Sequence, residues 1–502
     1  MWRLRAAVQA AGPAVCVEWA VSVTRYARRR ANRRKPAPIQ RAEALAAVLA
    51  ERTVAIHDDE LLVGNFSAHR VGGAIFPELH GVAQCEDLLS YRGRKLNPLA
   101  IRWRDVLTLA LRVMPFWLPR FLSMRSFPPL RALRFVADQL TAKRYVINET
   151  GGISHFVPDY ETLLALGTEG IAADARERLQ RCDEEEGRAF LESVVTACDG
   201  LAAFGDRYAD AARHAATATA DLDRREELAR IARICARVPR RPARGLHEVL
   251  QSLLLAQIAL NSESLDNSVC PGRLDQLLLP YYRADVEAGL LDEAGARELI
   301  GSFVVKMSEI VPVFSRRITR IHGGMFNGQV VAVGGVDREG NDATCELTWI
   351  LLDAIDELRM RQPNFHARIH AGSPPGYLAR VADMLRRGSG SPSLMNDECV
   401  VPMLTDRGAS LEDARDYSPV GCVEPVACAT TFGSTDAALV NLALPLERAL
   451  GTRDDGVCEE PLSACESMDA LLARLEREID HLIDGVIDDL QPVERANARF
   501  HP

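Results

Sequence analysis

The sequence predicts an α/β fold in which long helices come first and strands alternate with helices later. Residues 160–240 are dense in Ala, Glu, Arg and Leu with few helix breakers, which predicts long packed helices. Farther on, a β-branched run that ends in two glycines (327–337) and a strictly alternating run (363–373) flank a helical stretch (341–360). This rhythm is typical of a barrel, or of a parallel sheet with helices outside, within one large domain.

Helix and strand signals continue on both sides of this region. A helix is predicted at 292–307, where apolar residues recur every four positions behind the N-cap candidate Asp292. A further helix is predicted at 374–388, and a third strand within 391–402. The last segment, 468–502, has the pattern of an amphipathic helix.

Composition and charge narrow the class of protein. The most apolar segment, 105–122, contains Arg112, Pro115, Pro119 and Arg120, so its uncharged runs are far shorter than the roughly 20 residues of a membrane helix. We expect an amphipathic segment there and no membrane span. The N-terminus lacks the pattern of a secretory signal. A net charge of -9 gives no reason to expect nucleic acid or a membrane as partner, so a small-molecule substrate fits better.

The cysteines and histidines do not predict a metal site. The 12 cysteines are scattered without a C-x-x-C pair or a His/Cys cluster of zinc spacing, so reduced thiols in the cytoplasm are expected. His366 and His370 share one face of the alternating run, but no third ligand lies at a useful spacing. A hydrogen-bonded structural role, or a role in the lumen of the fold, is therefore expected for both histidines.

The stretch GCVEP (421–425) places Cys422 and Glu424 two residues apart between Gly and Pro. In an extended backbone their side chains would face one cavity. A neighbouring carboxylate raises the pKa of a thiol, which argues against a thiolate nucleophile and suits a neutral S–H that reacts by hydrogen-atom transfer. Spacing alone leaves open that Cys422 is a small buried hydrophobe. A cysteine hydrolase, which needs a histidine close to Cys422, is the further alternative.

GCVEP resembles the active-site loop of the glycyl radical enzymes, the pyruvate formate-lyase superfamily, in their glycerol/diol dehydratase-like branch. Other stretches resemble that family in the same order along nearly the whole chain. They are 57–78, 151–171, 272–282, 331–354, 361–370, 395–404 and 410–425. The number and order of these blocks make the resemblance much more specific than GCVEP alone.

The resemblance implies a fold and a mechanism. The fold is a ten-stranded α/β barrel of two half-barrels wrapped by helices, of which this chain is expected to form the first part, with a helix-rich N-terminal half. No cofactor is expected to bind directly. A glycyl radical, installed by a separate radical-SAM [4Fe-4S] activase, is expected to oxidise Cys422 to a thiyl that abstracts hydrogen from a substrate carbon. Glu424 matches the base that deprotonates the hydroxyl on that carbon.

Four more site residues follow from the resemblance. His155 falls where the dehydratases carry a histidine near the leaving hydroxyl, and Asp436 where they carry a carboxylate against the substrate. Ser268 lies in the matching substrate loop and is expected to bond a substrate hydroxyl. Asn267 stands where the glycerol enzymes usually have histidine, which argues against glycerol itself. The segment 426–436 also lacks the residues typical of the glycerol and choline branches.

The resemblance also implies an incomplete family domain. Residues 1–502 are expected to form a pyruvate formate-lyase-like domain that is incomplete at its C-terminus, because nothing resembles the radical loop R-V-x-G-[YFW] and the closing residues read VERANARFHP. The glycine radical domain is therefore expected to be absent. Expected partners are the activase, a separately encoded C-terminal part and a second copy of the chain, with no nucleic acid and no membrane.

The predicted function is a dehydratase-type lyase that acts on a diol, polyol or amino alcohol and favours C–O cleavage. Other members of the superfamily cleave C–N, C–S or C–C bonds, and these remain alternatives, as does a formate C-acetyltransferase-like enzyme. Glu424 argues against pyruvate formate-lyase itself, which has adjacent cysteines and no glutamate there. An alternative that is not an enzyme is a catalytically inactive fragment that keeps the N-terminal half of the fold.

Overall fold

The computed structural model describes the chain in eleven ranges. They are 1–79, 87–141, 143–146, 155–263, 268–321, 323, 327–388, 390–431, 437–453, 456–458 and 461–500. The chain divides into two compact units. The first comprises Met1–Phe76, Ala83–Val113 and Ile153–Gly433, and the second Pro77–Val82, Met114–Gly152 and Ser434–Pro502. The sequence pattern did not indicate this division.

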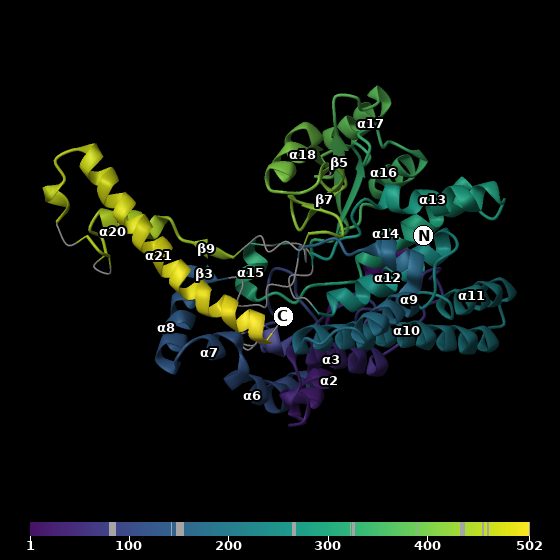
Figure 1. Cartoon of the computed structure of the whole chain (residues 1–502), viewed down its shortest axis with the longest axis horizontal. Coiled ribbons are helices and arrows are strands. Elements are labelled where there is room, and N and C mark those ends of the chain that lie inside the picture. The colour runs from purple at the N-terminus through teal and green to yellow at the C-terminus, as the bar shows by residue number, and fades with distance from the viewer. Residues whose placement is uncertain are drawn as a thin grey trace. The chain divides into compact units, whose positions relative to one another are not determined.

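Helices make up most of the first unit (Figure 1). They are α1 (Trp2–Ala10), α2 (Glu18–Arg28), α3 (Ala37–Glu51), α5 (Trp103–Thr108), α9 (Tyr160–Leu179), α10 (Glu185–Ala218), α11 (Leu222–Cys235), α12 (Leu246–Asn261), α13 (Leu274–Glu287), α14 (Glu293–Met307), α15 (Arg316–Ile321), α16 (Glu346–Leu358), α17 (Pro375–Arg386), α18 (Asp397–Asp406) and α19 (Leu411–Arg415). The long helix α10 packs against α3, α9 and α11. The helices predicted within residues 160–240 are thus confirmed.

The strands of the first unit are short. They are β1 (Ala14–Cys16), β2 (Gly72–Ala74), β4 (Val330–Gly334), β5 (Asn364–Ile369), β6 (Ser393–Asn396), β7 (Tyr417–Val420) and β8 (Glu424–Ala427). Strands β4, β5 and β6 form a three-stranded parallel sheet in that order. Helix α16 connects the first pair of strands and α17 the second, which confirms the predicted strand–helix rhythm. The predicted N-cap is also confirmed, because the Asp292 carboxylate accepts a hydrogen bond of 2.8 Å from the Gly295 N–H.

Strand β5 is buried on both faces. The alternating run predicted one apolar and one polar face, but residues from Phe365 to Arg368 are all buried. The fully buried Arg368 is tolerated because its guanidinium donates to both carboxylate oxygens of Asp397, at 3.0 and 2.8 Å, and to the Tyr417 carbonyl at 3.0 Å. The Tyr417 hydroxyl donates to the same Asp397 carboxylate at 2.8 Å. This network joins β5, the start of α18 and the start of β7.

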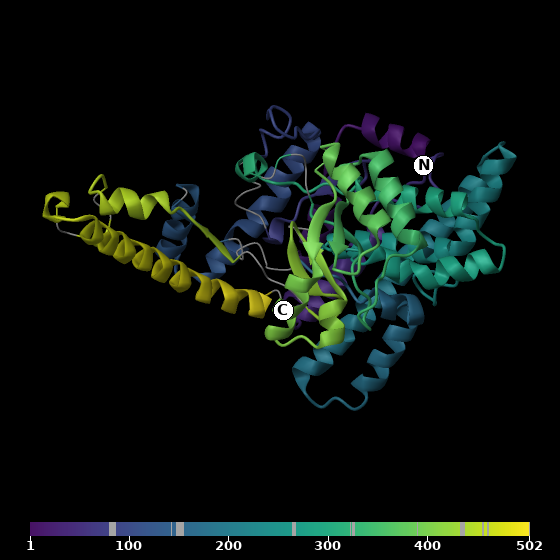
Figure 2. The same cartoon turned by 90° about the horizontal axis from the view of Figure 1, so that it is seen from above.

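The second unit is built on two long helices and a short strand pair. Its helices are α6 (Met114–Trp117), α7 (Leu122–Ser126), α8 (Pro129–Leu140), α20 (Ala443–Ala449) and α21 (Met468–Phe500), and its strands β3 (Arg144–Val146) and β9 (Ala438–Val440) pair antiparallel. Apolar side chains of α7, α8, β3 and α21 form its core, among them Phe127, Phe135, Val146 and Val493. Figure 2 shows α21 running alongside α20 and the β3–β9 pair.

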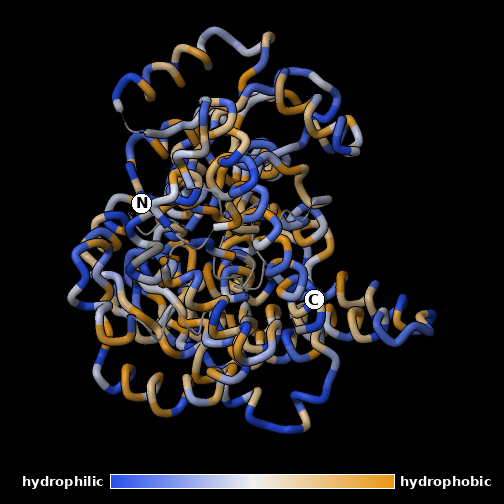
Figure 3. The backbone as a smooth tube through the Cα atoms, turned by 90° about the vertical axis from the view of Figure 1, so that its left-hand side faces the viewer, coloured by the Kyte–Doolittle hydropathy of each residue, from blue (hydrophilic) through white to orange (hydrophobic). Residues whose placement is uncertain are grey.

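The apolar segment predicted to be amphipathic has one buried face. Val106, Leu109, Val113 and Trp117 are buried and recur every three or four residues. By length and composition, Trp103–Ser126 is the one candidate for a membrane span among the described helices, and 41% of its most apolar window is buried. Figure 3 shows hydrophilic and hydrophobic residues alternating along the helical coils.

Candidate functional site

The candidate site is the turn of a β-hairpin. Strands β7 and β8 pair antiparallel, with Val420 opposite Glu424, so that residues 421–423 form the connecting turn. Gly421 adopts φ +60°, a left-handed conformation that glycine accepts without strain. Cys422 therefore lies in a turn rather than in the extended backbone expected from its spacing to Glu424, and it is exposed. Its thiol lies where a group from another segment can reach it.

The Glu424 carboxylate folds back onto this turn. Its Oε2 atom accepts hydrogen bonds from the backbone N–H of Cys422 at 2.8 Å and from that of Val423 at 2.9 Å. Two charge-assisted hydrogen bonds to consecutive N–H groups hold the carboxylate beside Cys422. The structure thus brings together the two residues that the sequence singled out, through the backbone of the turn.

His155 lies against the same turn. Its φ of 63° is unusual for a residue with a side chain, and the residue is only 8% exposed. A Cβ atom at Gly421 would lie 2.5 Å from the His155 Nε2 atom and 2.9 Å from the Glu424 Oε2 atom. The absence of a side chain at Gly421 is therefore what lets the imidazole and the carboxylate meet at the turn.

Ser268 lies in a segment that is hydrogen-bonded to Phe156, the residue after His155. The Phe156 N–H donates to the Ser268 carbonyl at 3.3 Å, and the Cys270 N–H donates to the Phe156 carbonyl at 3.0 Å. Ser268 is 3% exposed, and its hydroxyl lies close against Gly328, where an added Cβ would also be 3.2 Å from the Gly421 Cα atom. Asn267 and Asp436, the other two predicted site residues, lie outside the described residues.

Two residues of β5 hold the turn from the other side, and the sequence did not indicate either of them as a site residue. The Asn364 side chain donates from Nδ2 to the Gly421 carbonyl at 3.0 Å. His366, 1% exposed, hydrogen-bonds to the Cys422 backbone. Burial lowers the pKa of His366 to about 4, against the opposing effects of that hydrogen bond and of the Glu424 charge, so the imidazole is neutral at physiological pH.

The signal for these two residues was present in the sequence. Residues two apart on a strand share a face, and Asn364 and His366 satisfy this relation. The sequence instead grouped His366 with His370, whose Nε2 atom lies 3.1 Å from the Asp342 carboxylate. Within the described ranges no group of three or more His, Cys, Asp or Glu residues is arranged to hold a metal ion.

Two less exposed cysteines lie close to the hairpin, the buried Cys270 and the half-buried Cys428. Burial raises the pKa of Cys270 to about 12, and the Glu424 charge acts in the same direction. The Cys270 thiol lies 3.2 Å from the Gly328 carbonyl and 3.3 Å from the Ser268 carbonyl. Burial also raises the pKa of the Cys428 thiol. Of these three neighbouring cysteines, Cys422 alone is exposed.

Comparison with known proteins places the chain in a family. A family model described as pyruvate formate lyase-like matches residues 2–502. The isethionate sulfite-lyase of Nitratidesulfovibrio vulgaris is 32% identical over 440 residues, which cover 84% of this chain and 53% of that protein. The (2S)-3-sulfopropanediol dehydratase of Klebsiella oxytoca is 27% identical over 484 residues, which cover 93% of this chain and 60% of that protein.

Solved structures agree with this placement. The glycerol-bound B12-independent glycerol dehydratase from Clostridium butyricum matches with a TM-score of 0.92 and 28% identity, over 100% of this chain and 64% of that one. The chain thus spans between about half and two thirds of the length of these relatives. It belongs to the pyruvate formate lyase-like family of glycyl radical enzymes, as a relative of dehydratases and of isethionate sulfite-lyase.

Proposed function

We propose that this chain carries the reactive thiol and the acid–base groups of a glycyl radical lyase of the dehydratase type, which acts on a small hydroxylated substrate. The observation that carries the proposal is the meeting of three side chains at one turn. Cys422 is exposed on it, the Glu424 carboxylate is bonded to it at 2.8 Å, and the His155 imidazole lies against Gly421.

The residues present fit the radical chemistry of the family. When it is present, a glycyl radical supplies the one-electron oxidation that converts the loop thiol into a thiyl radical. An exposed cysteine at the tip of a hairpin suits a radical that arrives from another segment better than the buried Cys270 or the half-buried Cys428. The backbone bonds from Asn364 and His366 fix the turn, so the sulfur keeps a defined position.

Each step of the proposed reaction uses a named group. The Cys422 sulfur takes a hydrogen atom from the hydroxyl-bearing carbon of the substrate and becomes S–H, leaving a carbon radical. The Glu424 carboxylate accepts the proton of that hydroxyl. The neighbouring C–O bond then breaks, and the leaving oxygen takes a proton from His155 and departs as water. Cys422 finally returns its hydrogen atom to the product radical, so no external reductant is consumed.

Ser268, Asn267 and Asp436 are proposed to bind the substrate. Ser268 is supported by its position, since its hydroxyl lies against Gly328 near the turn. A buried hydroxyl beside the reacting groups suits recognition of a substrate hydroxyl, because a hydroxyl can both donate and accept a hydrogen bond. Asn267 and Asp436 rest on the family resemblance.

The proposal also covers the rest of the enzyme. The sheet β4–β5–β6 is proposed to belong to a ten-stranded barrel, which the match to the glycerol dehydratase structure supports. Residues 1–502 are proposed to act as one pyruvate formate-lyase-like domain in the cytoplasm, where a radical-SAM activase installs the radical. The radical-bearing glycine is proposed to belong to polypeptide outside these 502 residues, in the same or a separate chain.

A second candidate function is C–S cleavage. Isethionate sulfite-lyase is 32% identical to this chain, against 27% for the sulfopropanediol dehydratase. The same thiol and carboxylate serve this reaction, because loss of sulfite from the carbon next to the radical replaces loss of water.

The experiment is an anaerobic reaction of the chain with a family activase and the glycine-bearing part of a relative, on a panel of diols and isethionate. Product from a diol supports dehydration, and acetaldehyde with sulfite from isethionate supports C–S cleavage instead. The Cys422→Ser variant is expected to give no product, while Cys399→Ser, which alters another exposed cysteine, keeps the wild-type rate. If the glycyl radical forms but no substrate gives product, the result supports the alternative that the chain is catalytically inactive.

A further inference from the structure

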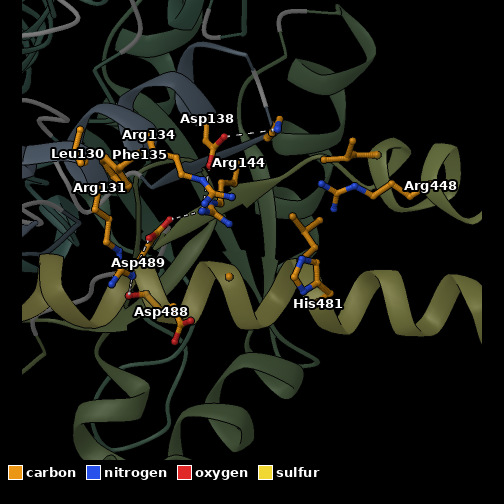
Figure 4. Close-up of a pocket in the computed structure, with 14 residues that line it drawn as sticks. Leu130, Arg131, Arg134, Phe135, Asp138, Arg144, Arg448, His481, Asp488 and Asp489 are labelled. Atoms are coloured by element: carbon orange, nitrogen blue, oxygen red, sulfur yellow. Dashed lines mark hydrogen bonds and ion pairs between the residues drawn. The ribbon is translucent and has the colours of Figure 1, made fainter. Parts of the chain in front are cut away.

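The second unit contains a pocket of about 620 Å³ that the proposed function does not use (Figure 4). It is lined from three helices, α8, α20 and α21, and from the start of β3. A volume of this size lies in the range of small-molecule sites, which is roughly 300–1,000 Å³. The pocket lies wholly among residues of the second unit.

Basic side chains predominate in this pocket. Its lining holds five Arg or Lys residues, three Asp residues and one His: Arg131, Arg134, Lys143, Arg144, Arg448, Asp138, Asp488, Asp489 and His481. The pocket therefore has an excess of two positive charges with His481 neutral, although the whole chain has a net charge of -9. A local positive excess in an acidic protein favours an anionic ligand.

Two of the three aspartates form ion pairs with Arg144. The Nη2 atom of Arg144 lies 2.8 Å from the Asp489 carboxylate and 3.2 Å from that of Asp138. Its Nη1 atom lies 2.5 Å from where a Cβ atom would stand at Gly485, a residue inside helix α21. Glycine in a helix interior lowers stability by up to about 1 kcal/mol relative to alanine. The close approach of Arg144 explains why a glycine stands at position 485, since a larger residue would displace the guanidinium.

Other cations face the same space from different elements. Arg134, on α8, and His481, on α21, are both exposed and make no ion pair among the described residues. Figure 4 shows Arg448 extending from α20 toward the side of the pocket that carries Arg144, with His481 below it. Arg448 is only 8% exposed. Guanidinium groups bind oxoanions through paired N–H donors, so this arrangement suits a tetrahedral dianion.

The remaining lining is apolar. Leu130, Phe135, Leu444 and Leu482 contribute to the pocket, and Phe135 and Leu482 belong to well-buried parts of their helices. A pocket larger than one inorganic oxoanion, with a basic side and an apolar side, fits an organic group attached to the anion. We propose that this pocket binds a small organic phosphate, with its phosphate at Arg134, Arg144 and Arg448 and its organic part against the leucines and Phe135.

The experiment is calorimetric titration of the chain with phenyl phosphate, inorganic phosphate and phenol. Phenyl phosphate is expected to bind more tightly than inorganic phosphate, and phenol is expected not to bind. The Arg134→Gln variant removes one charged donor and is expected to weaken binding about tenfold. Gly485→Ala, whose methyl group displaces Arg144, is expected to weaken it as well. Arg495→Gln, an exposed arginine on α21 outside the pocket, is the control and keeps the wild-type affinity.

Three results would overturn the proposal. The first is no binding of phenyl phosphate at millimolar concentration. The second is equal affinity for phenyl phosphate in wild type, Arg134→Gln and Gly485→Ala, which places binding elsewhere. The third is equal affinity for inorganic and phenyl phosphate, which removes the role of the apolar side. None of these results depends on radical activity.

Discussion

The Glu424 carboxylate closes the turn that carries Cys422, through a hydrogen bond of 2.8 Å from the Cys422 backbone N–H to Oε2. The same oxygen accepts the Val423 N–H at 2.9 Å. This carboxylate thus has two tasks, one observed and one proposed: it stabilises the backbone of the turn, and it is the base of the proposed reaction. The two tasks are separable by substitution, because an amide oxygen accepts the same hydrogen bonds and is a far weaker base.

Glu424→Gln is expected to keep the fold and lose the reaction. General acid–base groups contribute about 10²–10⁴-fold to rate, so turnover is expected to fall by at least about a hundredfold. The free energy of unfolding is expected to change by less than about 1 kcal/mol, because the turn keeps its acceptor. Anaerobic turnover and chemical denaturation measure the two effects. Unchanged turnover would remove Glu424 from the mechanism.

Gly421→Ala is expected to destabilise the hairpin. The new Cβ would lie 2.5 Å from the His155 imidazole, at a φ of +60° that alanine rarely adopts. Strain of this kind costs about 1–3 kcal/mol, and displacement of His155 adds to it. Gly408→Ala is the matched control, since Gly408 also has positive φ, +99°, but no atom within 4 Å of the added Cβ. Equal loss of stability in both variants would show that His155 is not crowded.

The three cysteines near the hairpin are expected to differ in their rates of alkylation. Cys422 is exposed, whereas Cys270 is buried with a pKa raised to about 12, and Cys428 is half-buried with a pKa that burial also raises. Iodoacetamide followed by peptide mass spectrometry is therefore expected to label Cys422 in the native chain, and the other two only after unfolding. Cys399, an exposed cysteine of α18, serves as the internal reference. Labelling of Cys422 at neutral pH more than tenfold faster than Cys399 would support the hydrolase alternative instead.

His366 is expected to make stability fall in mild acid. Its pKa is lowered to about 4 in the folded chain, below the unfolded value of 6.5, so the unfolded chain binds the extra proton first. Its contribution is therefore present above pH 6.5 and is lost as the pH falls toward 4, by up to about 3 kcal/mol. Denaturation of wild type and His366→Gln across this range measures the difference, with exposed His214→Gln as control. Parallel pH profiles would contradict the assignment.

Lys306→Met is expected to destabilise the first unit severely. Lys306 is 1% exposed and pairs with Glu60, at 2.5 Å, and with Glu309. Removing the cation takes the nearest positive charge from two buried carboxylates, of which Glu309 keeps only Arg70, whose Nε lies 3.5 Å away, and this costs about 3–5 kcal/mol. Lys35→Met, which breaks an ion pair between side chains that are 37% and 30% exposed, is expected to cost no more than about 1 kcal/mol. Adding Glu60→Gln and Glu309→Gln to Lys306→Met is expected to restore part of the loss.

The sequence predicted part of the secondary structure around the site. Hydrophobic periodicity indicated helices within 160–240 and at 292–307, 341–360 and 374–388, and the three strands β4, β5 and β6, because each of these signals is local. This periodicity did not indicate the β7–β8 hairpin. It was less accurate about exposure. The alternating residues of β5 predicted a polar face, but Arg368 is buried because Asp397 and Tyr417, distant in the chain, supply its partners.

By itself the sequence determined the alternation of strands and helices from β4 to β6, the family resemblance and the placement of Cys422 and Glu424 in one short stretch. The tertiary structure decided what surrounds that stretch. His155, Asn364 and His366 meet Gly421 and Cys422 across long separations in the chain. Such contacts depend on strand register and on the left-handed turn at Gly421, which no local pattern specifies. Residue type therefore predicted the thiol and the carboxylate of the site, whereas tertiary packing determined which groups contact them.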